Sequence, residues 1–244
     1  METSHPDDGR EKTRFAIALS YKFYNAGELE AEAKILLYKF DPERLYKPKP
    51  IDVYEVIEKC LGVEYDWKYI TPNQSILGAT LFTDGYVWVW PESSFRDGME
   101  PFEIYLSKGS ILIDATLTEE NNRGRENFTV MHEVFHQVLH KEWFCSEQPD
   151  LMHRSHIKTN DKKVLKTPLD FIEYQANRCA AAFLMPMELV ENEFKKRTSN
   201  RGVNYPLIYD DNVENIIKDM AEVYSVSKMA MFYRLQALRM IKTV

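Results

Sequence analysis

The chain has 244 residues, of which 44% are hydrophobic and 28% are charged, with a formal net charge of −7. The apolar content is enough for a buried core and excludes a wholly disordered protein. No apolar run approaches the roughly 18 residues of a membrane-spanning helix, and the polar first residues lack the apolar stretch of a signal peptide. The negative charge argues against a general nucleic-acid binder. Three cysteines, an odd and sparse set, indicate no disulfide framework and fit a reducing cytoplasm.

The N-terminal region is predicted to be helical after a short tail. Residues 1–14 are polar and are expected to form a flexible tail, followed by a single domain over 15–244. Apolar residues recur at helical spacing over 27–40, which predicts an amphipathic helix. A proline-rich connector follows, and a second helix is expected over 51–61, ended by Gly62.

The middle of the chain has the pattern of β-structure. Two β-branched and aromatic runs flank an Asp-Gly dipeptide, which predicts a β-hairpin over 76–90. A second hairpin is expected over 102–114, with residues 91–101 as the loop between the two. The run Tyr-Val-Trp-Val-Trp over 86–90 has no polar position, so this strand is predicted to be covered on both faces.

The second half of the chain is predicted to be mainly helical. A stretch without helix breakers covers 125–143, and residues 145–167 are expected to be a long irregular excursion rich in basic residues. A further helix is expected to begin at Pro168, because Thr167 can cap it and proline suits the first helical position. Pro186 is expected to end that helix or to open the next one.

Two closing helices are expected over 213–224 and 227–241, and their short connecting turn resembles a helix-turn-helix. Residues 213–244 carry five cationic and three acidic side chains. This excess of positive charge is too small for a helix that reads DNA. Direct nucleic-acid binding is therefore not expected, and the apolar positions favour packing of the pair onto the main body.

His132, Glu133 and His136 form the motif H-E-x-x-H within the predicted helix 125–143. Two histidines four residues apart project from one helix face, about 6 Å apart along the axis. Both imidazoles can then reach one Zn²⁺ at about 2.1 Å, and Glu133 can act as general base on a zinc-bound water. The motif therefore predicts a catalytic zinc site, although the same short pattern also occurs by chance in helices with surface histidines.

A catalytic zinc needs three protein ligands and an open position, and four residues are candidates for the third ligand. His140 lies about 12 Å along a straight helix from the first histidine, too far to share one ion with it. Glu142 stands where a longer zinc motif has its last histidine, but Leu139 replaces the glycine of that motif. Cys145 has no partner motif. Glu173, one turn into the next predicted helix, would complete a His₂Glu set and is the expected ligand, although its position alone fits an exposed helix glutamate.

These motifs resemble the ImmA/IrrE family of zinc-dependent metallopeptidases. That family shows Arg-x-x-Phe-Thr before H-E-x-x-H, often a further histidine on the same helix, and then Glu-x-x-Ala-Asn and a Leu/Met-Pro end. The matching residues are Arg125, Phe128, Thr129, His132, Glu133, His136, His140, Glu173, Ala176, Asn177, Phe183, Leu184, Met185 and Pro186. A weaker similarity extends over residues 27–241.

The resemblance implies that His132, His136 and Glu173 bind zinc and that Glu133 is catalytic. It also implies a protein substrate, since the family is associated with regulated cleavage of repressor-type transcription factors on mobile elements or in stress responses. Two features depart from the family pattern. Phe135 stands where the family usually has glycine, and the excursion after the motif helix is long. Both leave the ligands in place and bear on the identity of the substrate.

Five further residues are candidates for orienting a ligand or contacting the substrate: His140, His153, Arg154, His156 and Asn177. His140 faces the metal side of its helix and could orient a ligand or make an ordinary buried polar contact. His153, Arg154 and His156 lie in the basic excursion. They could bind an acidic substrate segment, or they could belong to a solvated loop.

The expected fold is α+β and zincin-like, with a small, largely antiparallel sheet packed on a helical core. In this fold the helix with the motif is crossed by a second helix that carries the third ligand. The expected function is that of a cytoplasmic zinc endopeptidase in which Glu133 activates a zinc-bound water. The alternative is a non-catalytic regulatory module, with structural or vestigial zinc, that contacts a repressor or DNA. No membrane association is expected.

Overall fold

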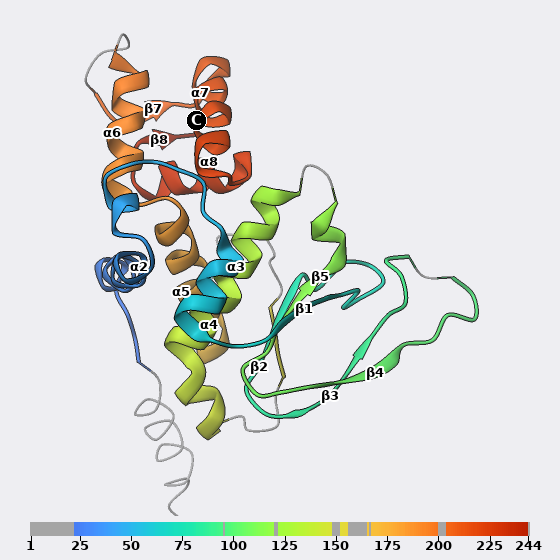
Figure 1. Cartoon of the computed structure of the whole chain (residues 1–244). Helices are drawn as coiled ribbons and strands as arrows, with labels where there is room; N and C mark the ends of the chain where they lie inside the picture. Colours follow the sequence, from blue (N-terminus) through green and yellow to red (C-terminus); the bar gives the residue numbers. More distant parts are fainter. Residues whose placement is uncertain are drawn as a thin grey trace, which may run out of the picture.

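The computed structural model describes residues 22–94, 96–119, 122–147, 152–155, 165, 167–199 and 204–243, with the backbone alone for 147 and 152–155. The predicted tail 1–14 lies outside the described residues. Helices (α), 3₁₀ or π turns (η) and strands (β) follow one another in this order (Figure 1): α2 (Ala26–Phe40), η1 (Pro42–Leu45), α3 (Val53–Val56), η2 (Ile57–Leu61), β1 (Tyr65–Lys68), β2 (Gly78–Leu81), β3 (Gly85–Val89), β4 (Phe102–Leu106), β5 (Ile111–Asp114), η3 (Ala115–Thr118), α4 (Arg123–Glu147), β6 (Met152–Ser155), α5 (Pro168–Leu184), α6 (Met187–Arg197), β7 (Leu207–Ile208), α7 (Asp211–Tyr224), α8 (Lys228–Ala237) and β8 (Ile241–Lys242).

Helix α2 forms where the sequence predicts it and packs against α5. It begins with a capping box in which the Asn25 and Glu28 side chains each accept a hydrogen bond from the other residue's backbone N–H. Leu29 and Leu37 are buried on its inner face, and the Cys179 thiol of α5 donates to the Leu29 carbonyl at 3.3 Å. The predicted helix over 27–40 is confirmed.

Helix α5 begins at Pro168 as predicted. Thr167 and Asp170 form a second capping box, which satisfies backbone N–H groups of the first turn. The helix predicted over 51–61 is also present as α3 and η2, and it ends at Gly62 with a left-handed φ of 62°. A glycine adopts this conformation at little cost, which explains why it terminates the helix there.

The strands β1, β5, β2 and β6 form one sheet in that order. β1 runs parallel to β5, while β2 is antiparallel to both β5 and β6. Two of the three pairings are therefore antiparallel, and helices pack beside the sheet. The α+β class expected from the sequence is confirmed.

Strand β2 lies between two layers because its side chains alternate between them. Gly78 and Thr80 face α4, where both contact the Glu133 side chain. Ala79 and Leu81 face the opposite way and join an apolar cluster with residues of the β3–β4 ribbon. The order of layers is thus α4, the four-stranded sheet and then the ribbon, which extends away from the helices in Figure 1.

The two predicted hairpins are wrong, because the strands pair with other partners. β3 pairs with β4 across the long loop that the sequence places between hairpins, from Gly85 opposite Leu106 to Val89 opposite Phe102. β2 instead pairs with β5 and β6 and is buried along its whole length. A strand in the interior of a sheet needs hydrogen-bond partners on both edges, and these partners come from residues distant in sequence.

The prediction that strand 86–90 is covered on both faces is also wrong. Val87 and Val89 are buried, but Tyr86 and Trp88 are exposed over 69% and 52% of their surface. The ribbon has only two strands and packs one face onto the sheet, so its other face remains at the surface.

The predicted irregular excursion 145–167 contains a strand. Helix α4 continues to Glu147, and β6 pairs with β2 so that His153 lies opposite Thr80 and Arg154 opposite Ala79. Residues 152–155 show no alternating apolar pattern, so pairing with the edge of β2 decides that they form a strand.

The closing helices α7 and α8 dock on the start of α4. A Cβ at Gly124 would lie 2.4 Å from the Val226 carbonyl carbon, so only glycine permits this approach. Asn127 donates to the Ser225 carbonyl at 2.9 Å. The second closing helix is shorter than predicted, because the chain leaves it after Ala237 to form β8, which pairs in parallel with β7.

Arg234 of α8 ties the closing helices to the core. Its side chain is fully buried and donates from Nε to the Met185 carbonyl at 2.9 Å. Its Nη1 and Nη2 both bond the Glu30 carboxylate of α2, the latter at 2.7 Å. A bidentate pair of this kind fixes the relative orientation of the two helices.

Candidate metal centre

The interior of α4 carries the two histidines of the H-E-x-x-H motif. The sheet covers one side of this helix and α5 covers another, so His132 and His136 are both 0% exposed. Phe135, which replaces the usual glycine of the resembled family, is buried and its ring lies 6.0 Å from that of Phe183 on α5. The bulky side chain therefore packs between the helices instead of obstructing the histidines.

Three donor groups converge between α4 and α5. The Nε2 atoms of His132 and His136 lie 2.8 Å apart. Glu173 Oε2 is 3.3 Å from His132 Nε2, and Glu173 Oε1 is 3.6 Å from His136 Nε2. The three ligand atoms all lie within 4.8 Å of one another, close enough to bind a single metal ion.

The hydrogen bonds of the histidines show that this group of side chains fits a cation. Asn177 Oδ1 lies 3.1 Å from His132 Nδ1 and can only accept, so Nδ1 carries the proton. A neutral His132 then presents the lone pair of Nε2 to the Glu173 carboxylate. Two acceptors that face each other require a positive charge between them, and two imidazoles with one carboxylate are a common zinc set.

The electrostatics of His132 agree with this requirement. Burial lowers the pKa of its imidazole, but the hydrogen bond that the protonated ring would donate to Glu173, together with the negative charge of Glu173, outweighs burial, so this pKa lies above its ordinary value. The charge of Glu133 raises it further. The protein environment thus stabilises a positive charge at the position where the three donors meet.

A second series of hydrogen-bonding contacts involves His136 through its Nδ1 atom. His140 Nδ1 lies 3.1 Å from His136 Nδ1, and His140 Nε2 lies 3.0 Å from Gln175 Oε1. Gln175 in turn donates to the Lys22 carbonyl at 3.2 Å. His140 therefore contacts the ring nitrogen of His136 that faces away from the donor group, so it can orient this imidazole. The sequence singled out His140 and Asn177, but not Gln175.

Glu133 lies beside the donor group and outside it. Its side chain is buried, and the Thr80 hydroxyl donates to its Oε2 at 2.6 Å. A Cβ at Gly78 would lie 2.6 Å from Glu133 Oε1 and 2.9 Å from its Cγ. Strand β2 thus fixes this carboxylate through two residues. Thr80 donates a hydrogen bond to it, and Gly78, which has no side chain, leaves the space that the carboxylate occupies. Sequence analysis identified neither residue; the only available signal was small residues at alternate positions of an apolar strand.

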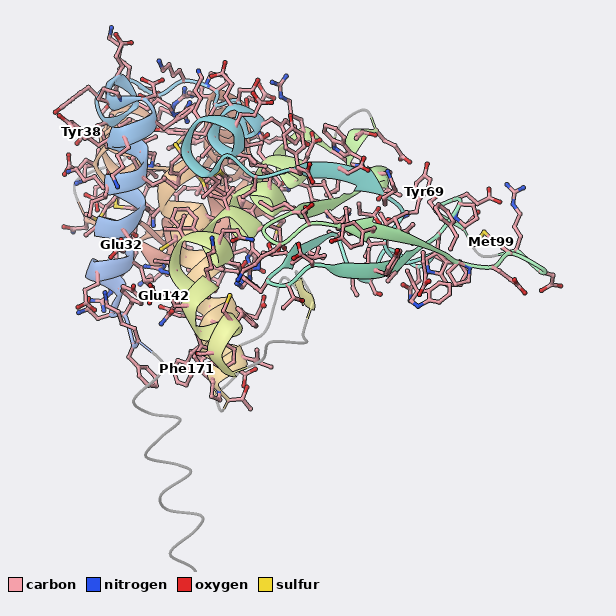
Figure 2. The ribbon with its side chains drawn as sticks, turned by 60° about the horizontal axis from the view of Figure 1, so that its bottom comes forward. Glu32, Tyr38, Tyr69, Met99, Glu142 and Phe171 are labelled. Atoms are coloured by element: carbon pink, nitrogen blue, oxygen red, sulfur yellow. The ribbon has the colours of Figure 1, made fainter. Side chains whose placement is uncertain are left out.

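The other candidates for a third ligand lie elsewhere. Glu142 is exposed, and Figure 2 shows it on the outer side of α4. The Cys145 thiol is directed to the Phe82 carbonyl at 3.7 Å. For His153 and Arg154 the structure describes the backbone in β6, next to β2, and His156 lies outside the described residues.

The comparison with known protein families agrees with this arrangement. The family model of the IrrE N-terminal-like domain, Peptidase_M78, matches residues 96–236, more than half of the chain. The chain belongs to the IrrE N-terminal-like domain family. The match runs from before β4 to α8 and includes the whole donor group, which confirms the resemblance found in the sequence. No curated protein matches the chain.

Family membership and the donor group together support a metallopeptidase in general terms, with a protein as substrate. Among the described residues, no helix combines the length and the apolar character needed to cross a membrane.

Proposed function

We propose that this IrrE N-terminal-like domain is a zinc-dependent endopeptidase in which His132, His136 and Glu173 hold the metal. The observation that carries the proposal is the separation of roles between neighbouring carboxylates. Glu173 joins the two imidazoles, whereas Glu133 is held beside them by strand β2. Two glutamates placed in this way supply one ligand and one general base.

Zinc bound by these residues would act as a Lewis acid that polarises the scissile carbonyl and lowers the pKa of a water. Glu133 would take a proton from the attacking water and return it to the amine that leaves. Thr80 would hold the Glu133 carboxylate in the orientation needed for both transfers. Asn177 and His140 would keep the two imidazoles turned with Nε2 toward the metal.

The proposed substrate is a protein, and we infer from the resemblance that it is a repressor-type transcriptional regulator. The proposed location is the cytoplasm, since Cys60, Cys145 and Cys179 are all free thiols. The rival function, a regulatory binding module with structural zinc, would require the same three ligands but no role for Glu133.

The test begins with zinc per chain, measured by elemental analysis on protein purified without added metal. The wild type is expected to hold one zinc, Glu173→Ala to lose it, and Glu133→Gln to keep it. Cleavage is then measured on a proteome-derived peptide library, where Glu133→Gln is expected to be inactive. Glu142→Gln is the matched control, since this exposed glutamate lies on the same helix and should change neither readout.

Two results would contradict the proposal. A wild-type protein that holds no zinc even after reconstitution would contradict the proposed zinc peptidase function. Zinc in the wild type with unchanged cleavage in Glu133→Gln would show that Glu133 is not the general base.

A further inference from the structure

The outer face of the β3–β4 ribbon carries exposed aromatic rings and a carboxylate. Tyr86, Trp88 and Tyr105 are exposed over 69%, 52% and 56% of their surface. The register places Tyr86 opposite Tyr105 and Trp88 opposite Glu103. Opposite residues of a strand pair share one face, so these four side chains form a single surface, here named the aromatic–acidic face.

Folding does not account for this surface. The inner face of the ribbon supplies the packing, since Val87, Val89 and Ile104 join the apolar cluster on the sheet. On the outer face the rings of Tyr86 and Tyr105 contact each other across the ribbon, with centroids 5.4 Å apart and planes at 68°. Grouped exposed aromatic residues are typical of interaction sites, and Trp and Tyr dominate the binding energy of many interfaces.

The charge of the ribbon indicates which partner the face fits. Residues 85–106 contain four acids, Glu92, Asp97, Glu100 and Glu103, and one base, Arg96. That base is already paired with Glu92 at 3.0 Å. The ribbon therefore carries net negative charge, and Glu103 places one carboxylate directly among the exposed rings. Both the net charge of the ribbon and the position of Glu103 favour a positively charged partner.

We propose that the aromatic–acidic face binds an arginine-containing segment of a partner protein. A guanidinium can stack on the Trp88 indole and at the same time bond the Glu103 carboxylate through two N–H groups. A second copy of the chain would bring two Glu103 carboxylates and two acidic loops together, which is unfavourable. Nucleic acid would be repelled for the same reason.

This face is separate from the candidate metal centre. The ribbon packs its inner side on the sheet, and α4 lies on the opposite side of that sheet. Figure 2 shows the ribbon, with Met99 at its end, extending away from the helices. The proposed interaction thus goes beyond the peptidase function and can be measured without zinc or cleavage.

The test uses a fluorescein-labelled peptide of alternating arginine and serine, with fluorescence anisotropy as the readout at low salt. Wild-type protein is expected to bind the peptide, and Trp88→Ala to bind about tenfold more weakly. Glu103→Lys should weaken binding at least as much while it keeps every ring. Tyr38→Ala is the matched control, because Tyr38 is also exposed, at 65%, but lies on α2, away from the ribbon in Figure 2.

The variants also separate a specific face from general attraction to a protein of net charge −7. Equal affinity for wild type, Trp88→Ala and Glu103→Lys would overturn the proposal, as would no binding by the wild type. If the wild type sediments as a dimer and Trp88→Ala sediments as a monomer, the proposal is overturned, because the face then binds a second copy of this chain. Thermal melting of each variant, with circular dichroism as the readout, verifies that the compared proteins are folded.

Discussion

Gly78 and Glu133 approach so closely that a Cβ on Gly78 would lie 2.6 Å from the glutamate's Oε1 and 2.9 Å from its Cγ. Thr129 Cγ2 is also 2.9 Å from that position, so an added methyl group would meet two side chains of α4 at once. Gly78 is therefore a positioning residue for the proposed general base, although it lies on a different element and far away in sequence.

Gly78→Ala is expected to displace Glu133 while the metal ligands stay in place. General-base catalysis contributes about 100-fold or more, so cleavage of the peptide library should fall by about that factor. Zinc per chain should remain one. Gly85→Ala is the control, because a Cβ there would meet no atom within 4 Å beyond its own chain neighbours, and the residue belongs to β3. Full activity in Gly78→Ala would refute this role.

Thr80→Val is expected to remove the hydrogen bond to Glu133 Oε2, measured at 2.6 Å, at nearly constant side-chain shape. A misaligned carboxylate should lower kcat by about tenfold with little change in KM. Steady-state kinetics on a peptide identified from the library would measure both constants. Thr80→Ser keeps the hydroxyl and should restore activity; an equal loss in both variants would point to packing instead.

Asn177→Leu is expected to lower zinc affinity by about tenfold to 100-fold, since the acceptor that fixes the His132 tautomer is lost. Competition with a chromophoric zinc chelator would measure the dissociation constant. Asn177→Asp retains an oxygen acceptor for His132 Nδ1 and should bind zinc at least as tightly as the wild type. Unchanged affinity in Asn177→Leu would show that the contact does not orient the ligand.

Glu30→Ala is expected to lower the free energy of unfolding by about 3 kcal/mol, because it leaves the fully buried Arg234 guanidinium without its carboxylate. Urea unfolding at fixed zinc concentration would measure the loss. Lys34 lies on the same helix as Glu30 and forms an exposed ion pair with Glu188 of α6. Lys34→Ala removes this pair, and the free energy of unfolding should fall by less than about 1 kcal/mol. Equal effects of the two substitutions would contradict the structural importance of Arg234.

Local sequence was sufficient where a structure depends on neighbouring residues. The helices beginning after Asn25 and Thr167 follow from caps and apolar spacing that lie within a few positions. The spacing of His132 and His136 likewise fixes both imidazoles on one helix face. Glu173 was selected from the sequence because a ligand from a second helix was needed, and the structure brings its carboxylate to these imidazoles.

Strand pairing could not be read in the same way. The Asp-Gly dipeptide at residues 84–85 predicts a hairpin between β2 and β3, yet each strand pairs with segments further along the chain. The pairing is decided by which strand edges are free and which faces need cover in the packed structure. The same competition leaves Trp88 at the surface, although its own segment looks fully apolar.

The sequence by itself determined the family, the helical elements of the core and the residues able to bind a metal, because each depends on short-range spacing and residue chemistry. Only the tertiary structure showed that β2 supports Glu133 through Thr80 and Gly78, and that the ribbon presents an aromatic–acidic face. These features depend on contacts between segments separated by tens of residues. Such contacts form when the layers pack, and no local pattern specifies them.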